Sequence, residues 1–237
     1  MSISDVQSLY LKGDVEGAYG AMLPIYADDH GEYASRMMFK VALAVLEKRL
    51  ENNDLSELSK IYRALLRLVL RYGNEMYAER QALLKTAFQL SALGIDIDPK
   101  NSGLLLDGII SIPDVALPLH LQMGQWGETV AALYLQYQGC RLIEHDWKSS
   151  HRDIDLIVMD GQTIVFVEVK TRNTHSLQSP EQAVNYTKIC RLRKSIHHYV
   201  KQHRVCSNIR FDIISVIGEL GLFPLVRHLK DVPIMIR

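Results

Sequence analysis

One predicted hairpin constrains this chain more than any other part of its 237 residues. Two runs rich in Ile, Val, Leu and Phe flank Asp160-Gly161, a dipeptide that favours a two-residue β-turn. Four charged residues interrupt these runs: Asp153 and Asp155 before the turn, Glu168 and Lys170 after it. A small sheet gains nothing by burying isolated charges, so these residues call for a separate explanation.

The expected strand pairing brings the four charged side chains to one face. With Asp160-Gly161 as the turn, Asp153 lies opposite Glu168 and Asp155 lies opposite Phe166. Alternate residues of a strand share a face, so the two acids before the turn meet the acid and the lysine after it. A register slip of one residue would scatter them over both faces.

Such a cluster predicts a metal site. Two carboxylates about 5 Å apart repel each other by roughly 3 kcal/mol at an effective dielectric of about 20. A divalent cation held by the acids would reverse that cost, and oxygen ligands suit Mg²⁺ or Mn²⁺. Lys170 beside the cation would stabilise negative charge developing on a phosphodiester. The plainer alternative is a solvent-facing sheet surface whose ion pairs contribute about 0–1 kcal/mol each.

The two halves of the chain differ in charge. Residues 1–123 carry 12 Lys/Arg and 16 Asp/Glu, a net of −4, whereas residues 124–237 carry 15 and 11, a net of +4. The second half also holds seven of the nine histidines. This split indicates two units with different partners, the basic one being suited to a polyanion.

The two halves also differ in pattern, which predicts an α+β chain with two domains. Residues 1–118 show helical spacing and turn signals, with Asp54 and Glu57 placed as a capping box for one helix. We expect an all-α domain there, either an irregular bundle or a set of helical hairpins. Residues 119–237 follow the order α-β-β-β-α-β, which predicts a mixed sheet flanked by helices.

A basic helix is expected over about 181–202. Between Glu181 and Asp212 the chain carries no acidic residue, whereas a solvated face normally mixes both signs. The pattern predicts a surface that contacts a phosphate backbone, although a merely basic helix exterior is the alternative. The expected contacts are Lys188, Arg191, Arg193, Lys194 and Lys201.

Several motifs of the second half resemble a known family. The run Gly124-x-x-Gly127-Glu128 is followed by Asp155-Leu156-Ile157 and by Phe166-Val167-Glu168-Val169-Lys170-x-Arg172. This layout resembles the PD-(D/E)XK nuclease fold, and more closely the YraN-like family of predicted endonucleases, which is related to archaeal Holliday-junction resolvases. The resemblance covers about residues 120–220 and none of the first half.

The resemblance implies a restriction-endonuclease-like α/β domain with specific site residues. Asp155 and Glu168 would hold Mg²⁺ or Mn²⁺, with Asp153 as a further metal contact where such proteins usually have Gly-Glu. Lys170 would assist at the scissile phosphate, and Glu128 would complete the carboxylate set. The remaining expected nucleic-acid contacts are Arg172, which closes the lysine motif, and Gln182, which forms a Gln-x-x-x-Tyr pair of the kind some nucleases of this fold carry.

The resulting hypothesis is a metal-dependent nuclease acting on DNA, branched or single-stranded. The alternative is a catalytically silent protein that keeps the fold to bind nucleic acid or to serve as a scaffold. The helical half would be a partner-binding or regulatory module in the first case and would recruit partners in the second. A third interpretation makes the helical half the main actor, a protein-interaction domain to which the nuclease-like half adds localisation. If the protein acts on branched DNA, a two-fold homodimer is expected by analogy with related folds.

The rest of the sequence indicates a cytoplasmic protein without a membrane segment. No apolar run reaches the roughly 18 residues that span a bilayer, and the N-terminus lacks signal-peptide features. Cys140, Cys190 and Cys206 are odd in number and have no metal-binding spacing, so we expect free thiols rather than disulfides or zinc.

Overall fold

The computed structural model of the protein describes residues 1–110, 116–150, 152–173 and 186–234. Contacts divide the chain into two compact units, Met1–Leu105 and Leu106–Arg237. The boundary expected from the sequence, after residue 118, falls further along the chain, directly before helix α7 (Leu119–Tyr137). Within the described ranges, no helix combines the length and the apolar character needed to cross a membrane.

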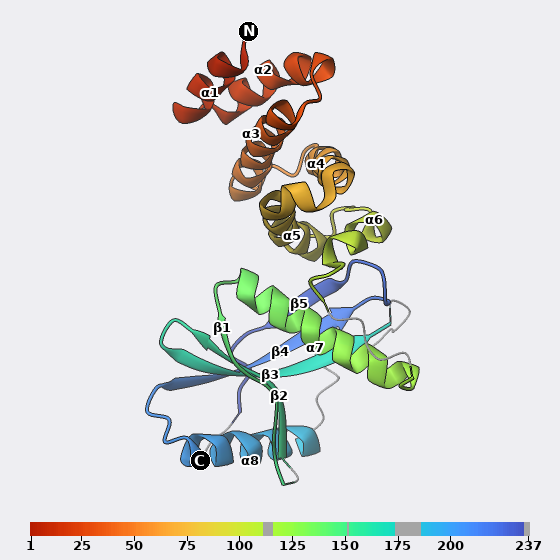
Figure 1. Ribbon diagram of the computed structural model, residues 1–237. Helices are drawn as coiled ribbons and strands as arrows, with labels where there is room; N and C mark the ends of the chain where they lie inside the picture. The colour runs from red at the N-terminus through yellow and green to blue at the C-terminus, as the bar shows by residue number, and fades with distance from the viewer. Residues whose placement is uncertain (111–115, 151, 174–185, 235–237) are drawn as a thin grey trace. The chain divides into compact units, whose positions relative to one another are not determined.

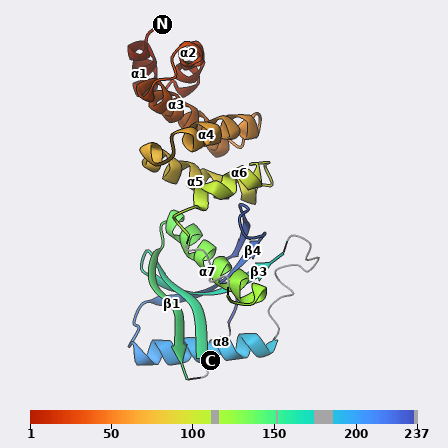
Figure 2. The ribbon, with the colours of Figure 1, turned by 45° about the vertical axis from the view of Figure 1, so that its right-hand side comes forward.

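The first unit is a stack of helical hairpins (Figures 1 and 2). Its elements are α1 (Ile3–Leu11), α2 (Val15–Asp28), α3 (Glu32–Glu51), α4 (Leu58–Tyr72), the 3₁₀ turn η1 (Gly73–Met76), α5 (Tyr77–Ala92) and α6 (Pro99–Gly103), and the 3₁₀ turn η2 (Leu104–Leu106) spans the boundary to the second unit. Consecutive helices from α1 to α5 pack against one another, and α3 also contacts α1 and α5. The first unit is therefore all-α, as the helical spacing indicates.

The start of α4 corrects one detail of the sequence interpretation. The helix begins at Leu58, and no side chain caps it, because Glu57 stands in a left-handed conformation with φ 57°. The Asp54 carboxylate instead accepts a hydrogen bond from the Ser56 amide at 3.0 Å. Because the Asp54 carboxylate binds within this local turn, it does not cap α4, and the predicted capping box is wrong.

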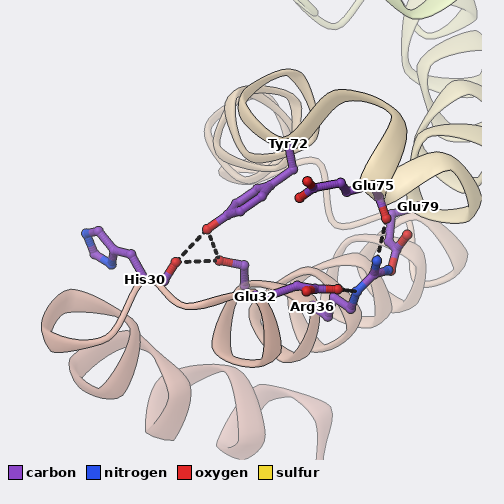
Figure 3. A network of polar contacts seen from close by, with 7 residues as sticks. His30, Glu32, Arg36, Tyr72, Glu75 and Glu79 are labelled. Atoms are coloured by element: carbon purple, nitrogen blue, oxygen red, sulfur yellow. Dashed lines mark hydrogen bonds and ion pairs between the residues drawn. The ribbon is translucent and has the colours of Figure 1, made fainter.

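A polar network links successive hairpins of the first unit (Figure 3). Arg36 of α3 donates hydrogen bonds to Glu32 at 2.9 Å and, across the stack, to Glu79 of α5 at 2.6 Å. The Tyr72 hydroxyl, at the end of α4, donates to the carbonyl of His30, just before α3. These contacts tie α3 to α5 and the end of α4 to the residue before α3.

The second unit is a five-stranded mixed sheet with helices on both faces (Figures 1 and 2). Its elements after α7 are β1 (Arg141–Ser149), β2 (Arg152–Asp160), β3 (Thr163–Arg172), α8 (Tyr186–Gln202), β4 (Asn208–Ile217) and β5 (Leu225–Leu229). The strands adjoin in chain order; β3 and β4 pair in parallel and the other neighbours pair antiparallel. The predicted order α-β-β-β-α-β is confirmed, and β5 is an additional strand.

Alternation along the strands assigns their side chains to the two faces. Ile164 and Phe166 of β3 belong to a buried core that Leu192, Ile196 and Tyr199 of α8 complete. Helix α7 covers the opposite face with its own buried residues and contacts β3 most extensively. The sheet is therefore a rigid middle layer, and its edges and strand ends are where polar groups can gather.

A buried carboxylate in the middle of β4 ties this strand to β5. The Asp212 side chain, fully buried, accepts two hydrogen bonds from Arg210, one from His228 and one from the Asp231 amide, all at 2.9 Å. Burial alone would raise the pKa of Asp212, but the bonds from His228 and Arg210 outweigh it and lower the pKa to about 2. Ionised Asp212 is thus part of the folded core.

Asp212 makes the stability of the second unit pH-dependent in acid. Its pKa in the folded state, about 2, lies below the ordinary value of 3.8, so the unfolded chain binds the proton first as the pH falls. Asp212 therefore contributes about 2 kcal/mol above pH 4, which is lost between about pH 4 and pH 2. Urea unfolding across this window should show a shallower pH slope for Asp212→Asn; an unchanged slope would contradict the assignment.

Candidate active site

The turn between β2 and β3 is Gly161-Gln162, one residue later than the sequence indicates. Asp160 remains in the strand, where it pairs with Thr163. Its carboxylate is held by the Arg210 guanidinium at 2.9 Å, and Gly161 takes the positive φ of 59° at the first turn position. An ion pair across the sheet, which no local pattern reveals, keeps Asp160 out of the turn.

The pairing register consequently differs by two residues from the predicted one. Leu156 pairs with Val167, so the next facing positions are Asp155 and Glu168. The prediction that Asp153 lies opposite Glu168 is therefore wrong. Because side-chain direction has a period of two, a two-residue shift leaves every side chain on its expected face.

Strands β2 and β3 separate at the acidic positions. Their ladder ends at Leu156 and Val167, while β2 stays paired with β1 as far as its first residue, Arg152. Beyond that last pair the Asp155 carboxylate accepts a hydrogen bond from the Val169 amide at 2.7 Å. Figure 1 shows β1 and β2 bending away from β3. A side chain thus replaces the backbone ladder where the strands diverge.

Glu168 and Lys170 of β3 form an ion pair around this point. The Lys170 ammonium bonds the carboxylate of Glu168, whose side chain is only 2% exposed. Because Asp155 binds the amide of the intervening Val169, three charged groups converge on a three-residue stretch of β3. Lys170 offsets the cost of burying Glu168, and the pair lies beside the Asp155 carboxylate where β2 leaves β3.

Helix α7 approaches β3 closely because it carries a glycine at the contact. A Cβ placed on Gly127 would overlap the hydroxyl of Thr171. Glu128, the next residue, therefore reaches the same end of the sheet as the charged residues of β3. The second glycine of the Gly-x-x-Gly-Glu motif thus allows α7 to pack closely on β3.

Glu128 lies among charged groups of β1 and β3. Burial raises the pKa of Glu128, and the charges of Asp146 and Glu168 add to that rise while Lys148 opposes it. The His145 imidazole lies 3.5 Å from the Glu128 carboxylate. The sequence interpretation missed these β1 residues, although three consecutive ionisable residues in a short strand, Glu-His-Asp, were a usable signal.

Asp153 takes a peripheral place. It is exposed and faces Lys148 of β1 in the strand pairing. The Asp146 hydrogen bond raises the pKa of Lys148 most, with Glu128 and Asp153 adding to it. The structure therefore groups Asp153 with the charges of β1 rather than with Glu168.

The donor chemistry of the site allows one kind of metal binding. Within the described ranges, no three His, Cys, Asp or Glu side chains stand close enough to hold a metal on their own. Asp155 and Glu168 supply oxygen donors only. Mg²⁺ usually keeps several waters and takes one or two carboxylates plus substrate phosphate. These residues fit a metal shared with a phosphate, and do not form a site closed by protein ligands.

The basic face of α8 lies on the side of the helix away from the core. Arg191, Lys194 and Lys201 are exposed, as is His197 between them, whereas Leu192 on the other side is buried. The exposed cations span about 15 Å along the helix axis at 1.5 Å per residue. They can follow several successive phosphates of a nucleic-acid backbone.

The other expected nucleic-acid contacts have separate positions. Arg193 is half-buried beside this face, and Arg172 is half-buried at the end of β3. Lys188 belongs to α8, but its side chain lies outside the described residues, as does all of Gln182.

Fold and site together define a class. A mixed five-stranded sheet with a helix on each face, carrying an acid on one strand and Glu-x-Lys on its neighbour, is the architecture of the PD-(D/E)XK nuclease-like fold. The chain belongs to the UPF0102 family, the YraN-like group, described as "Uncharacterised protein family UPF0102", whose profile matches residues 127–216.

Relatives from three bacteria carry the name UPF0102 protein. The protein of Bacteroides thetaiotaomicron is 36% identical over 112 residues, which are 47% of this chain and 92% of the relative. That of Rhodococcus opacus is 34% identical over 113 residues, 47% of this chain and 96% of the relative. That of Nocardia farcinica is 37% identical over 111 residues, 46% of this chain and 87% of the relative.

Substitution of Gly127 tests whether close helix–strand approach positions Glu128. Gly127→Ala should force α7 away from Thr171 and destabilise the protein by about 1–3 kcal/mol in urea unfolding. Gly124→Ala is the matched control, because an added Cβ there meets nothing within 4 Å, and it should stabilise α7 by about 0.5–1 kcal/mol. Equal effects of the two substitutions would contradict the role of Gly127.

Proposed function

We propose that this protein is a divalent-metal-dependent nuclease that hydrolyses DNA phosphodiester bonds, with branched or single-stranded DNA as its substrate. The observation that carries the proposal is the convergence of Asp155, Glu168 and Lys170 where β2 leaves β3. Membership of the UPF0102 family is consistent with a nuclease-like role.

Each residue of the site has a role that its position supports. Asp155 and Glu168 would hold the metal, which when bound polarises the phosphate and activates water. The hydrogen bond from the Val169 amide keeps the Asp155 carboxylate in place for metal binding. Lys170, 20% exposed at its side chain, can turn its ammonium towards charge developing on the phosphate. Glu128 would complete the acidic set from the helix side.

The exposed cations of α8 would bind the phosphate backbone of the nucleic acid. Arg191, Lys194 and Lys201 can neutralise phosphates without reading sequence, so binding should weaken steeply with salt. The helical unit, built of stacked hairpins, would recruit a protein partner, since such stacks present extended surfaces. Both roles are part of the proposal.

Replacement of Lys170 tests the catalytic assignment. With Mg²⁺ or Mn²⁺, wild-type protein should cleave flap or junction DNA, and Lys170→Ala should lower the rate by about a hundredfold or more. Lys60→Ala is the control, since Lys60 is an exposed lysine of the first unit, and it should cleave at the wild-type rate.

Glu168 loses an ion-pair partner in Lys170→Ala, so a double variant separates catalysis from folding. Glu168→Gln with Lys170→Met removes both charges at nearly constant shape and should keep the wild-type circular dichroism spectrum while cleaving nothing. Cleavage that survives either variant would place the active site elsewhere. Wild-type protein that binds DNA with Mg²⁺ but never cleaves it would favour the scaffold function.

A further inference from the structure

A cleft of about 850 Å³ adjoins the candidate active site within the second unit. It lies between the first turns of α7 and the last residues of β3, and a turn after β4 closes one side. Lys170 lines it, so the cleft opens directly onto the proposed catalytic group.

The walls of the cleft combine apolar and cationic side chains. Leu119, Met123 and Leu220 supply the apolar part, and Leu119 is 67% exposed. Lys170 and Arg172 at the end of β3 supply two cations and Glu219 supplies one carboxylate, so the charged part of the lining is positive by one charge. A large exposed apolar residue beside cations indicates a ligand with an apolar face and a negative charge.

The size of the cleft narrows the choice of ligand. Pockets for small-molecule-sized groups measure about 300–1,000 Å³, so 850 Å³ holds a nucleotide-sized group. The exposed ring of His120, also in the lining, offers a stacking surface for a planar base. A base inside a duplex is stacked and paired, and cannot enter without being flipped out at a cost.

We infer that this cleft binds an unpaired nucleotide next to the scissile phosphate, with the base against the apolar wall and the phosphate towards Lys170 and Arg172. The inference rests on the proposed function and narrows its substrate to DNA with an unpaired nucleotide at the cut, held in a defined subsite. Paired DNA would reach Lys170 without filling the cleft and would gain less binding energy.

Gly124 offers a way to fill the cleft without disturbing α7. It lines the cleft, and a Cβ added there meets nothing within 4 Å. Gly124→Phe should therefore fold and occupy the space with its ring. Gly20→Phe is the matched control, because Gly20 is also a helical glycine with open space around it, but in the first unit.

The test is binding in EDTA, where no metal supports cleavage, with fluorescein-labelled flap DNA and a fully paired duplex of equal length. Wild-type protein and Gly20→Phe should bind the flap about tenfold more tightly, since base stacking of this kind is sequence-tolerant and substantial. Gly124→Phe should bind both DNAs equally, and His120→Ala should reduce the preference. Equal binding of both DNAs by wild type, or an unchanged preference in Gly124→Phe, would overturn the inference.

Measuring binding in EDTA tests the cleft separately from the proposed hydrolysis. A flap preference that disappears in Gly124→Phe supports the cleft even if Mg²⁺ never produces cleavage, an outcome that would remove only the hydrolytic function. Cleavage of flap and duplex at equal rates, unaffected by Gly124→Phe, would leave the nuclease in place and remove the cleft as a nucleotide site.

Discussion

The hydrogen bond from the Val169 amide to the Asp155 carboxylate determines the geometry of the candidate site. It stands where the backbone ladder between β2 and β3 ends, so a side chain holds two strands that would otherwise separate freely. Its second effect is to fix an acid beside Glu168 and Lys170. One charge-assisted bond, of a kind that contributes about 1.5–3 kcal/mol, thereby links the shape of the sheet to its chemistry.

The elements around the Asp155–Val169 hydrogen bond help to hold the candidate site in place. Gly127 lets α7 contact β3 closely, which brings Glu128 near enough to Glu168 for their charges to interact. Helix α8 packs its apolar side under the sheet and leaves its cations exposed. On the other side of β3, the Asp212 network fixes β4 against β5. The sheet thus acts as a frame that positions both the acids of β2 and β3 and the helix that carries the exposed cations.

The sequence predicted features that depend on periodicity and missed those that depend on distant contacts. The faces of Asp155 and Glu168 followed from alternation, which tolerated a two-residue error in register. The turn itself was misplaced because Arg210, some fifty residues further along the chain, holds Asp160 in the strand. The Glu-His-Asp run marked β1 as unusual, but the partner of His145 depends on the fold, which brings β1 against Glu128. Local sequence patterns therefore predict which face of the sheet a side chain points to, whereas ion pairs between distant residues decide where the turn lies and which residues meet.

A crystal structure of the protein soaked in Mn²⁺ tests the central claim most directly, because anomalous scattering locates the ion without assumptions about its ligands. A metal site shared by the two acids should give a peak about 2.0–2.3 Å from carboxylate oxygens of both Asp155 and Glu168, with the remaining ligands supplied by water. Side chains of these two acids on opposite sides of the sheet, with no peak between them, would contradict it.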